Sequence, residues 1–369
     1  MLCTATYYET LCLDTEHWYC MHDCVIIATD KQIRDIVSYT TYKKQYSSLP
    51  ITEKQGFHIP AFVNAHTHID NAYLFGKTTT EQGFYSWLCS VLQERKEDSY
   101  IQKYLESNTN SLLIQDTAFI ATIASSPWLQ TLLTQQEIPH YVFYESIGGY
   151  PLTPEFNTSP PFYNMSYAGH ALYSTEPSVL RQIKALCNQY NVPFSIHLAE
   201  HEEEHLFLQG VPSDFSTLLQ KRLRPNYNPP YKSPVAYAYE LGLLDNNTLA
   251  IHCVHCSKED IELLQKSHVY VCLCPRSNTY IGVGTADART LYESDIPLCI
   301  ATDGLASNTS LSMWEEAVYA MNIYGFTLKE CIPMMTIQPA RALGIDSIFG
   351  KLQINSYPMT TEIPQEYLG

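Results

Sequence analysis

The stretch Pro60-Ala-Phe-Val-Asn-Ala-His-Thr-His-Ile-Asp70 decides the fold prediction for this chain. Residues 57–63 form a short, mostly apolar run of the kind found in a buried strand. His66 and His68 follow, separated by one residue. Residues i and i+2 of an extended backbone point to the same side, so both imidazoles can meet one metal ion where the strand ends. The alternative is a hydrogen-bonded, inert pair of polar residues.

The length and composition describe a globular protein with a large core. The chain has 369 residues, of which 45% are apolar and 16% are charged, and α/β barrels reach this length as single units. No apolar run approaches the roughly 18 residues that span a membrane, and residues 1–10 show no secretory signal. The net charge of −16 disfavours nucleic acid as a partner, because phosphate binding needs clustered Lys and Arg. We expect a soluble cytoplasmic protein.

The twelve cysteines do not form a disulfide framework. Five of them lie in apolar runs after residue 250, where free Cys behaves as a small buried hydrophobe. The segment His252-Cys-Val-His-Cys256 superficially resembles a zinc knuckle, but such a site normally needs a second ligand pair in a loop or turn. Residues 248–254 have the pattern of a strand, so we expect no structural zinc there.

Apolar runs of strand length alternate with helical patterns along the chain. Continuously apolar strands belong to a parallel sheet that is covered on both sides. Eight such units predict an α/β fold, a (β/α)₈ TIM barrel, whose active-site residues lie at the C-terminal ends of the strands. The runs are the stretch from residue 57 to His68 and residues 118–123, 140–144, 165–171, 193–196, 248–252, 269–273 and 297–301.

The remaining segments predict the domain organisation. Residues 1–56 are expected to form an N-terminal β appendage, residues 57–335 the barrel, and residues 336–369 a C-terminal segment that returns to the appendage as a small, truncated β-sandwich. Two β-like pieces lie in the first of these parts, at residues 7–13 and 24–28. Helical patterns lie within residues 78–107 and at residues 178–190, 236–241, 258–264 and 311–324.

Polar residues fall at the expected C-terminal ends of the barrel strands. His66 and His68 from the first strand, His197 from the fifth and Asp303 from the eighth form a plausible set of four metal ligands. Three neutral imidazoles and a carboxylate suit Zn²⁺, with Fe²⁺ as the second choice. A catalytic site would also keep a water, whose pKa a bound metal lowers toward neutrality.

Two further residues extend this site. Glu200 lies three residues past His197, and we interpret it as a proton shuttle between water and leaving group. The alternative is an acid at a helix start that complements the helix dipole. His252 closes the sixth strand, where it would elsewhere more often be a core histidine. Beside this ligand set we assign it a catalytic role.

With these residues, the chain resembles the amidohydrolase superfamily. The matching branch contains chlorohydrolases and S-adenosylhomocysteine, guanine and aminofutalosine deaminases. The matching pieces run in family order over roughly residues 57–345. Their combination is specific, although no single piece is. They are PAFVNAHTHID, HALYSTEP, SIHLAEHEEE, IHCVHCSKEDI, CPRSNTYIGVG, ATDGLASNTSLSMWEE and QPARALGI.

The resemblance implies a function and roles for the site residues. The ligand set above would hold one metal, Glu200 would shuttle protons, and His252 with Asp303 would orient the attacking hydroxide. The expected reaction is deamination of an adenine-type nucleoside, such as aminodeoxyfutalosine or an S-adenosylhomocysteine-like compound, with release of ammonia. The alternatives are hydrolysis of another C–N or C–Cl bond on a heteroaromatic ring, or a non-catalytic binding relative.

Three residues are expected to bind the substrate. His170 closes the fourth strand beside His197 of the fifth, within reach of a sugar hydroxyl. Arg276 follows the seventh strand and can bind a distal carboxylate through two parallel hydrogen bonds; a structural ion pair with an acid at the barrel rim remains the alternative. Asn278 lies in the same motif as Arg276. The expected partner is thus a small-molecule substrate, a nucleoside, and a homodimer is left open.

The chain also departs from the family pattern. No Lys lies between Lys103 and Lys184, so a carboxylated lysine that bridges two metals is excluded and one metal is expected. The segment after Leu343 is short, which truncates the C-terminal share of the β-sandwich. The Pro-rich stretches at residues 151–161 and 212–234 are either lids or ordinary surface loops.

Overall fold

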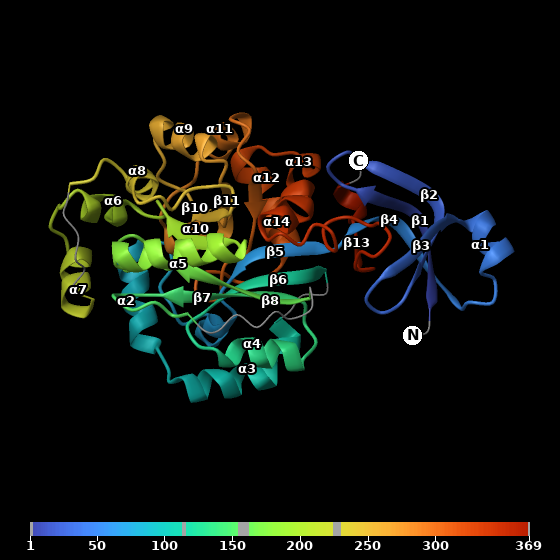
Figure 1. The fold of residues 1–369 in the computed structure, drawn as a ribbon, viewed down its shortest axis with the longest axis horizontal. Coiled ribbons are helices and arrows are strands. Elements are labelled where there is room, and N and C mark those ends of the chain that lie inside the picture. Colours follow the sequence, from blue (N-terminus) through green and yellow to red (C-terminus); the bar gives the residue numbers. More distant parts are fainter. Residues whose placement is uncertain (1–2, 113–115, 154–161, 224–229, 368–369) are drawn as a thin grey trace.

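The computed structural model describes residues 3–112, 116–153, 162–223 and 230–367. It contains two sheets, which lie next to each other in Figure 1. The larger one confirms the predicted barrel: its eight strands are all parallel, and their order in the sheet follows the chain from first to last. The strands are β5 (Phe62–Thr67), β6 (Thr117–Ala124), β7 (His140–Ser146), β8 (Tyr163–Gly169), β9 (Phe194–Leu198), β10 (Thr248–His252), β11 (Tyr270–Leu273) and β12 (Leu298–Ile300).

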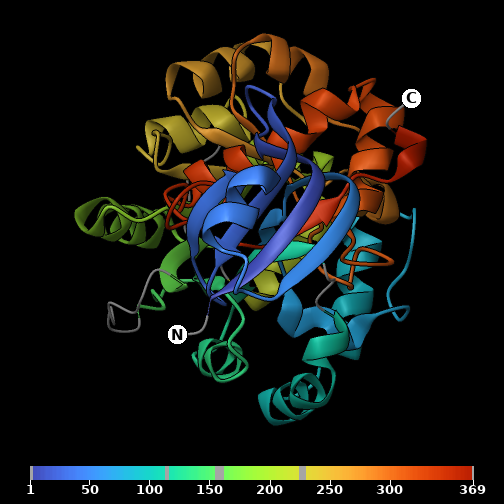
Figure 2. The same cartoon turned by 90° about the vertical axis from the view of Figure 1, so that its right-hand side faces the viewer.

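Helices surround the barrel strands, as the end-on view in Figure 2 shows. The strands are buried almost throughout because the helices cover the outside of the sheet. Each predicted helical region is helical, although the first is divided into α2 and α3. The helices of this part are η1 (Ile69–Leu74), α2 (Phe84–Glu94), α3 (Asp98–Leu112), α4 (Trp128–Gln135), α5 (Pro177–Tyr190), α6 (Glu202–Leu208), α7 (Asp214–Arg222), α8 (Pro234–Glu240), α9 (Lys258–Lys266), α10 (Pro275–Ile281), α11 (Ala288–Glu293), α12 (Met313–Tyr324), α13 (Leu328–Met335), α14 (Ile337–Ala342) and η2 (Gln365–Tyr367).

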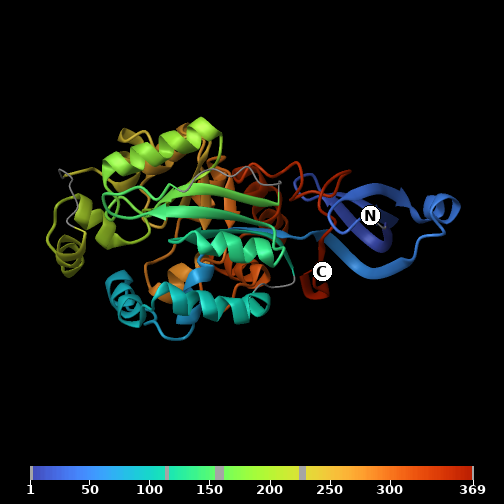
Figure 3. The same ribbon diagram turned by 60° about the horizontal axis from the view of Figure 1, so that its bottom comes forward.

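The smaller sheet has five strands in the order β13-β4-β1-β2-β3 and is assembled from both ends of the chain. The arrowheads of the barrel strands point away from it in Figure 3, so it lies beyond their N-terminal ends. The site at the C-terminal ends therefore faces away from this appendage. Its elements are β1 (Thr4–Asp14), β2 (Tyr19–Ala28), β3 (Ile33–Ser38), α1 (Tyr39–Gln45), β4 (Ile51–Pro60) and β13 (Thr360–Glu362).

The strand predicted to start at residue 57 is divided between the two sheets. Residues 57–60 end β4 of the small sheet, and the barrel strand β5 begins at Phe62. The backbone N–H of Ala61, between the two, donates to the carbonyl of Met359. The apolar pattern continues through this change of sheet, so the sequence could not show it. The predicted division at residues 56 and 335 stays a prediction.

Hydrogen bonds outside the regular ladder connect the first barrel strand to the last. The Asn64 amide donates to the Thr302 hydroxyl at 2.7 Å, and the N–H of Asp303 donates to the carbonyl of His66 at 3.1 Å. The loop after β12 is thereby held against β5. Two of the predicted metal ligands come from this junction.

Among the described residues, none of the helices combines the length and the apolar character needed to cross a bilayer. Residues 154–161 of the stretch 151–161 and residues 224–229 of the stretch 212–234 lie outside the described residues. The described part of the second stretch contains α7 (Asp214–Arg222), and a role of either stretch as a lid stays a prediction.

Candidate active site

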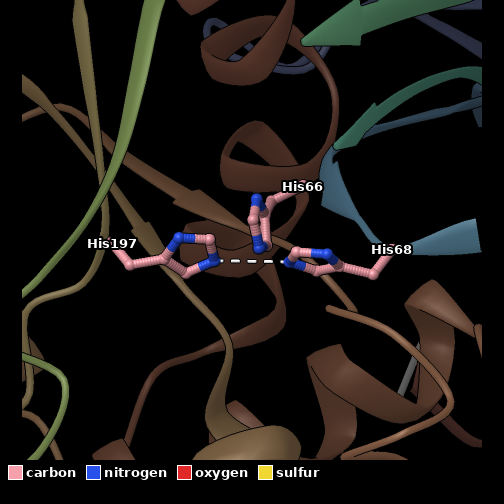
Figure 4. A group of neighbouring side chains, drawn as sticks. All are labelled: His66, His68 and His197. Carbon is pink, nitrogen blue, oxygen red and sulfur yellow. Dashed lines mark hydrogen bonds between the residues drawn. The ribbon is translucent and has the colours of Figure 1, made fainter. Parts of the chain in front are cut away.

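Three imidazoles converge at the C-terminal mouth of the barrel. The Nε2 atoms of His68 and His197 lie 3.3 Å apart, and Figure 4 shows the ring of His66 between them. One ring nitrogen from each of the three lies within 4.8 Å of the other two. The structure therefore brings together the histidines that the sequence predicted from strands that are far apart in the chain.

The carboxylate of Asp303 completes this group. Its Oδ1 lies 3.6 Å from Nε2 of His66 and 3.6 Å from Nε2 of His68. Its Oδ2 accepts hydrogen bonds from the hydroxyls of Ser277 at 2.6 Å and Ser307 at 3.0 Å. Burial opposes its ionisation, but the attraction of the facing imidazoles of His66 and His68 outweighs this and holds the pKa of Asp303 well below its usual value.

These side chains fit a metal ion in their chemistry and spacing. Nε2 of His66 is buried and has no hydrogen-bond partner among the described residues, which is costly unless a ligand satisfies it. Two nitrogens each about 2.0–2.1 Å from a tetrahedral Zn²⁺ lie about 3.3–3.4 Å apart, close to the separation of His68 and His197. Nδ1 of His197 lies 3.0 Å from the carbonyl of His170 and donates to it, which leaves Nε2 as the free ligand atom.

Burial keeps four histidines of the site neutral, the form in which imidazole binds metals. Burial lowers the pKa of His68 to about 3 and the pKa values of His170 and His252 to about 4. Burial likewise lowers the pKa of His197 well below its usual value. None of these rings carries a proton that would compete with an ion at neutral pH.

Glu200 and His252 face each other beside the ligand group. Oε1 of Glu200 lies 3.5 Å from Nε2 of His252, and burial raises the pKa of Glu200 well above its usual value. Nδ1 of His252 lies 2.9 Å from Oδ1 of Asn278. Since an amide oxygen only accepts, His252 carries its proton on Nδ1 and turns an unprotonated Nε2 toward Glu200.

Backbone strain is concentrated where the strands end at this site. Ala199, His252 and Asp303 have φ values of 50°, 73° and 57°, in the left-handed region that non-glycine residues rarely adopt. Each follows or ends one of the strands that carry the site. A Cβ at Gly304 would lie 2.7 Å from the Cβ of His68, so only glycine lets the two loops approach this closely.

A cavity of about 450 Å³ opens over these residues, a volume typical of small-molecule sites. His68, His197, Glu200, His252 and Asp303 line its inner part. Apolar side chains of α2 and α7 line the part farther out, with Arg95 and Arg222 among them. The arrangement allows a planar, partly apolar ligand to lie with one edge against the metal ligands.

The structure corrects two of the predicted substrate contacts. Arg276 does not line this cavity. Its Nη2 lies 2.7 Å from a carboxylate oxygen of Glu315, and its backbone N–H donates to Oε2 of Glu316 at 3.3 Å. The alternative of a structural ion pair is therefore the one observed. Asn278 contacts His252 and orients it, and it too is absent from the cavity wall. His170 does line the cavity.

Three acidic residues of the cavity wall were not predicted from the sequence as site residues: Asp70, Asp98 and Glu145. Glu145 follows the predicted third strand directly, so the rule that selected the other strand-end residues would have found it. Burial raises the pKa of Glu145 to about 8 and that of Asp70 to about 7. Asp70 lies in the stretch that decided the fold, but nothing in the pattern showed that it faces the cavity.

Comparison with known proteins agrees with this geometry. The model of the family described as "Amidohydrolase family" matches residues 155–358. This chain belongs to the amidohydrolase family. The match covers strands β8 to β12 and with them the site residues from His170 to Asp303.

Relatives of known name are nucleoside deaminases. This amidohydrolase is 24% identical over 348 residues to a 5-methylthioadenosine/S-adenosylhomocysteine deaminase of Halothermothrix orenii, covering 88% of this chain and 76% of that protein. It is 26% identical over 315 residues to an aminodeoxyfutalosine deaminase of Nitratiruptor, covering 81% of this chain and 76% of that protein. A 5'-deoxyadenosine deaminase of Methanothrix thermoacetophila is 32% identical over 174 residues, and that match spans only 37% of its length.

A solved structure shows the same fold. Aminofutalosine deaminase of Helicobacter pylori, in complex with methylthio-coformycin, superposes with a TM-score of 0.81 at 20% identity, covering 98% of this chain and 93% of that one. At this level of identity the likeness shows the fold alone. Both the barrel and the appended sheet are therefore shared with that enzyme.

Proposed function

We propose that this amidohydrolase is a metal-dependent deaminase of an adenine-type nucleoside. The convergence of His66, His68, His197 and Asp303 at the floor of the cavity carries the proposal, because a three-histidine, one-carboxylate set suits a hydrolytic metal. The names of the relatives add the substrate class. We propose Zn²⁺ as the ion, with Fe²⁺ second, and one ion per chain.

The single ion is supported by the absence of a bridging lysine. Lys184 is the first lysine after Lys103, and its ammonium group pairs with Asp245 at 2.5 Å, away from the cavity wall. No lysine of the described residues lines the cavity. The ligand set can thus complete one metal centre but offers no bridge to a second.

The chemistry that such an ion supplies when bound is Lewis acidity, which makes a water molecule acidic near neutral pH. The raised pKa of Glu200 lets its carboxyl donate a proton to the ring nitrogen beside the amine-bearing carbon. Its carboxylate then accepts a proton from the attacking water and passes it to the departing amine. Water is consumed and ammonia leaves. As the ring carbon becomes a carbonyl, the carboxylate of Glu200 takes the remaining hydroxyl proton, which restores its carboxyl group.

His252 and Asp303 orient the attacking water. Nε2 of His252 is unprotonated, because Asn278 accepts the proton on Nδ1, so it accepts a hydrogen bond from the water. Asp303 stays ionised and is fixed by the hydroxyls of Ser277 and Ser307. Both acceptors direct the lone pair of the water oxygen toward the ring carbon.

An ammonia-release assay on the zinc-loaded protein tests this proposal. The substrates would be adenosine, 5'-methylthioadenosine, S-adenosylhomocysteine and aminodeoxyfutalosine, with guanine and a chlorinated triazine as comparison compounds. We expect ammonia and the matching hypoxanthine nucleoside from at least one of the first four. Turnover of only the comparison compounds would favour hydrolysis of another C–N or C–Cl bond, and no turnover at all would favour a binding relative.

A further inference from the structure

Glu145 is a buried carboxyl group in the cavity wall that the proposed mechanism does not use. It is the penultimate residue of β7, its side chain is 8% exposed, and it lines the cavity. Its Oε1 is buried and has no hydrogen-bond partner among the described residues. A buried carboxyl oxygen without a partner costs free energy, so a ligand that supplies one is bound more tightly.

The nearest histidine does not supply this partner. Nδ1 of His197 lies 3.8 Å from Oε1 of Glu145, which is too long for a hydrogen bond. That nitrogen already donates to the carbonyl of His170 at 3.0 Å. Glu145 therefore does not act by orienting the metal ligand beside it.

His170 is the other polar neighbour on the same wall. It follows β8, which pairs with β7 in parallel register, and its N–H donates to the carbonyl of Ser146 at 3.2 Å. Its Nδ1 bonds to the hydroxyl of Ser174 at 2.5 Å, so Nε2 has no protein partner among the described residues. A carboxylate oxygen of Glu145 and a ring nitrogen of His170 lie within 4.8 Å of each other.

A second metal ion does not fit this pair. Protein metal sites that hold an ion without substrate use at least about three protein ligands, and His197 already uses both of its nitrogens. An anionic group does not fit this pair either, because neither the Glu145 carboxyl nor the neutral ring of His170 supplies a positive charge. A hydroxyl group fits, because an oxygen about 2.8 Å from each of two atoms bridges a gap of about 4.5–4.8 Å.

We infer that Glu145 and His170 together bind a sugar hydroxyl of the nucleoside, and that Glu145 determines specificity for it. This inference rests on the proposed function, because it takes the substrate to be a nucleoside. A substrate without the hydroxyl would leave the buried carboxyl unpaired. The cost of leaving a buried polar group unsatisfied corresponds to a discrimination of about 10- to 100-fold, in favour of the hydroxylated substrate.

The test compares adenosine, 2'-deoxyadenosine and 3'-deoxyadenosine on the zinc-loaded enzyme. We expect kcat/KM for at least one deoxy compound to be about 10- to 100-fold below that for adenosine. Glu145→Leu should lower kcat/KM for adenosine and bring this ratio close to one, whereas Glu145→Gln, which keeps a polar group, should retain part of it. The dissociation constants of the same three compounds for a Glu200→Gln background, measured by calorimetry, should show the same pattern.

Glu316→Gln is the matched control for the loss of a buried glutamate. Glu316 is fully buried on α12 but does not line the cavity, so this variant should keep the wild-type ratio. If Glu145→Leu does not fold, as judged by circular dichroism, the test uses Glu145→Gln instead. In that variant the ratio of kcat/KM between adenosine and the deoxy compound should be smaller than in the wild type.

Two results would overturn the inference and leave the deaminase function intact. One is wild-type enzyme that deaminates all three nucleosides equally well. The other is a Glu145→Leu variant whose kcat/KM falls by the same factor for every substrate. Wild-type enzyme that deaminates no nucleoside at all would overturn the proposed function and this inference with it.

Discussion

Two carboxylate sites at opposite ends of the barrel differ in how their oxygens are satisfied. Where the small sheet meets the barrel, Arg341 binds both carboxylate oxygens of Glu16 at 2.5 and 2.6 Å. At the cavity, Glu145 and Asp70 each leave a buried oxygen without a partner among the described residues, and Glu200 faces only a neutral ring. The first arrangement stabilises the fold by itself.

The difference shows what the unpaired groups are for. A buried polar atom without a partner lowers stability, and in the wall of a cavity a ligand, an ion or a proton transfer can use it. Substitutions at the cavity should therefore change binding and turnover more than stability. Substitutions in the paired regions should do the reverse. Substitutions of both kinds test this difference between cavity residues and paired residues.

The largest effect is expected for Asp303→Ala. It removes one of four proposed ligands and, among the described residues, the only carboxylate within 4 Å of a ring nitrogen of His66 and His68. We therefore expect the variant to lose its metal and its turnover to fall to background. Elemental analysis and the ammonia assay measure the two losses. Cys256→Ser is the control, because we place no metal on this thiol. Loss of the metal in the control instead would contradict the ligand assignment, as would two metals per chain in the wild type.

The next effect is a loss of turnover without a loss of metal. Glu200→Gln and His252→Asn should each lower kcat by about 10²-fold or more, the scale of a general acid–base group. Neither side chain belongs to the ligand set, so the metal content should stay at the wild-type value. Near-normal activity in either variant would mean that its assigned role is wrong.

Arg276→Met should affect stability and not specificity. The variant breaks the ion pair with Glu315 and removes the cation nearest to buried Glu316, so we expect a loss of about 1–3 kcal/mol in urea unfolding. KM should change equally for adenosine and a carboxylated nucleoside. Arg222→Met is the control within the cavity, and we expect it to change that KM ratio. A larger KM change for the carboxylated compound in Arg276→Met would place Arg276 at the substrate after all.

The smallest effect is expected at the junction of the two sheets. The hydrogen bonds from Arg341 lower the pKa of Glu16, so this carboxylate stabilises the fold above its unfolded pKa. That contribution disappears as the pH falls through the lowered folded value. Glu16→Gln should thus cost about 1 kcal/mol at pH 7 and less near pH 3, which lies below the unfolded pKa. Urea unfolding at both pH values measures this, with the exposed Glu53→Gln as control, and an undiminished cost at pH 3 would contradict it.

The sequence predicted the barrel because its evidence is local. Each strand is a continuous apolar run, and the position of a polar residue after such a run places it at the C-terminal mouth. That rule located His197 and Asp303 correctly, although they lie far apart in the chain. It does not give the direction of a side chain, which is why Arg276 was assigned to the substrate although it points toward α12.

Other features have no local signature. The left-handed backbone at Ala199, His252 and Asp303 is imposed by the surrounding structure on residues that do not favour it. The division of the first strand between two sheets lies inside one apolar run. The strands β3 and β4 of the appendage were not predicted, because their polar residues hide the alternation.

The closure of the barrel also has a consequence for how the chain holds together. Asn64 and Thr302, which join the first strand to the last, are separated by 238 residues, and a contact across so long a loop has a high entropic cost. The last strand, β12, has only three residues with which to offset it. His66 and Asp303, on either side of this junction, belong to the proposed ligand set. An ion bound there would act as a cross-link between the first and the last strand of the barrel. The same four side chains would then serve catalysis and also stabilise the closed barrel.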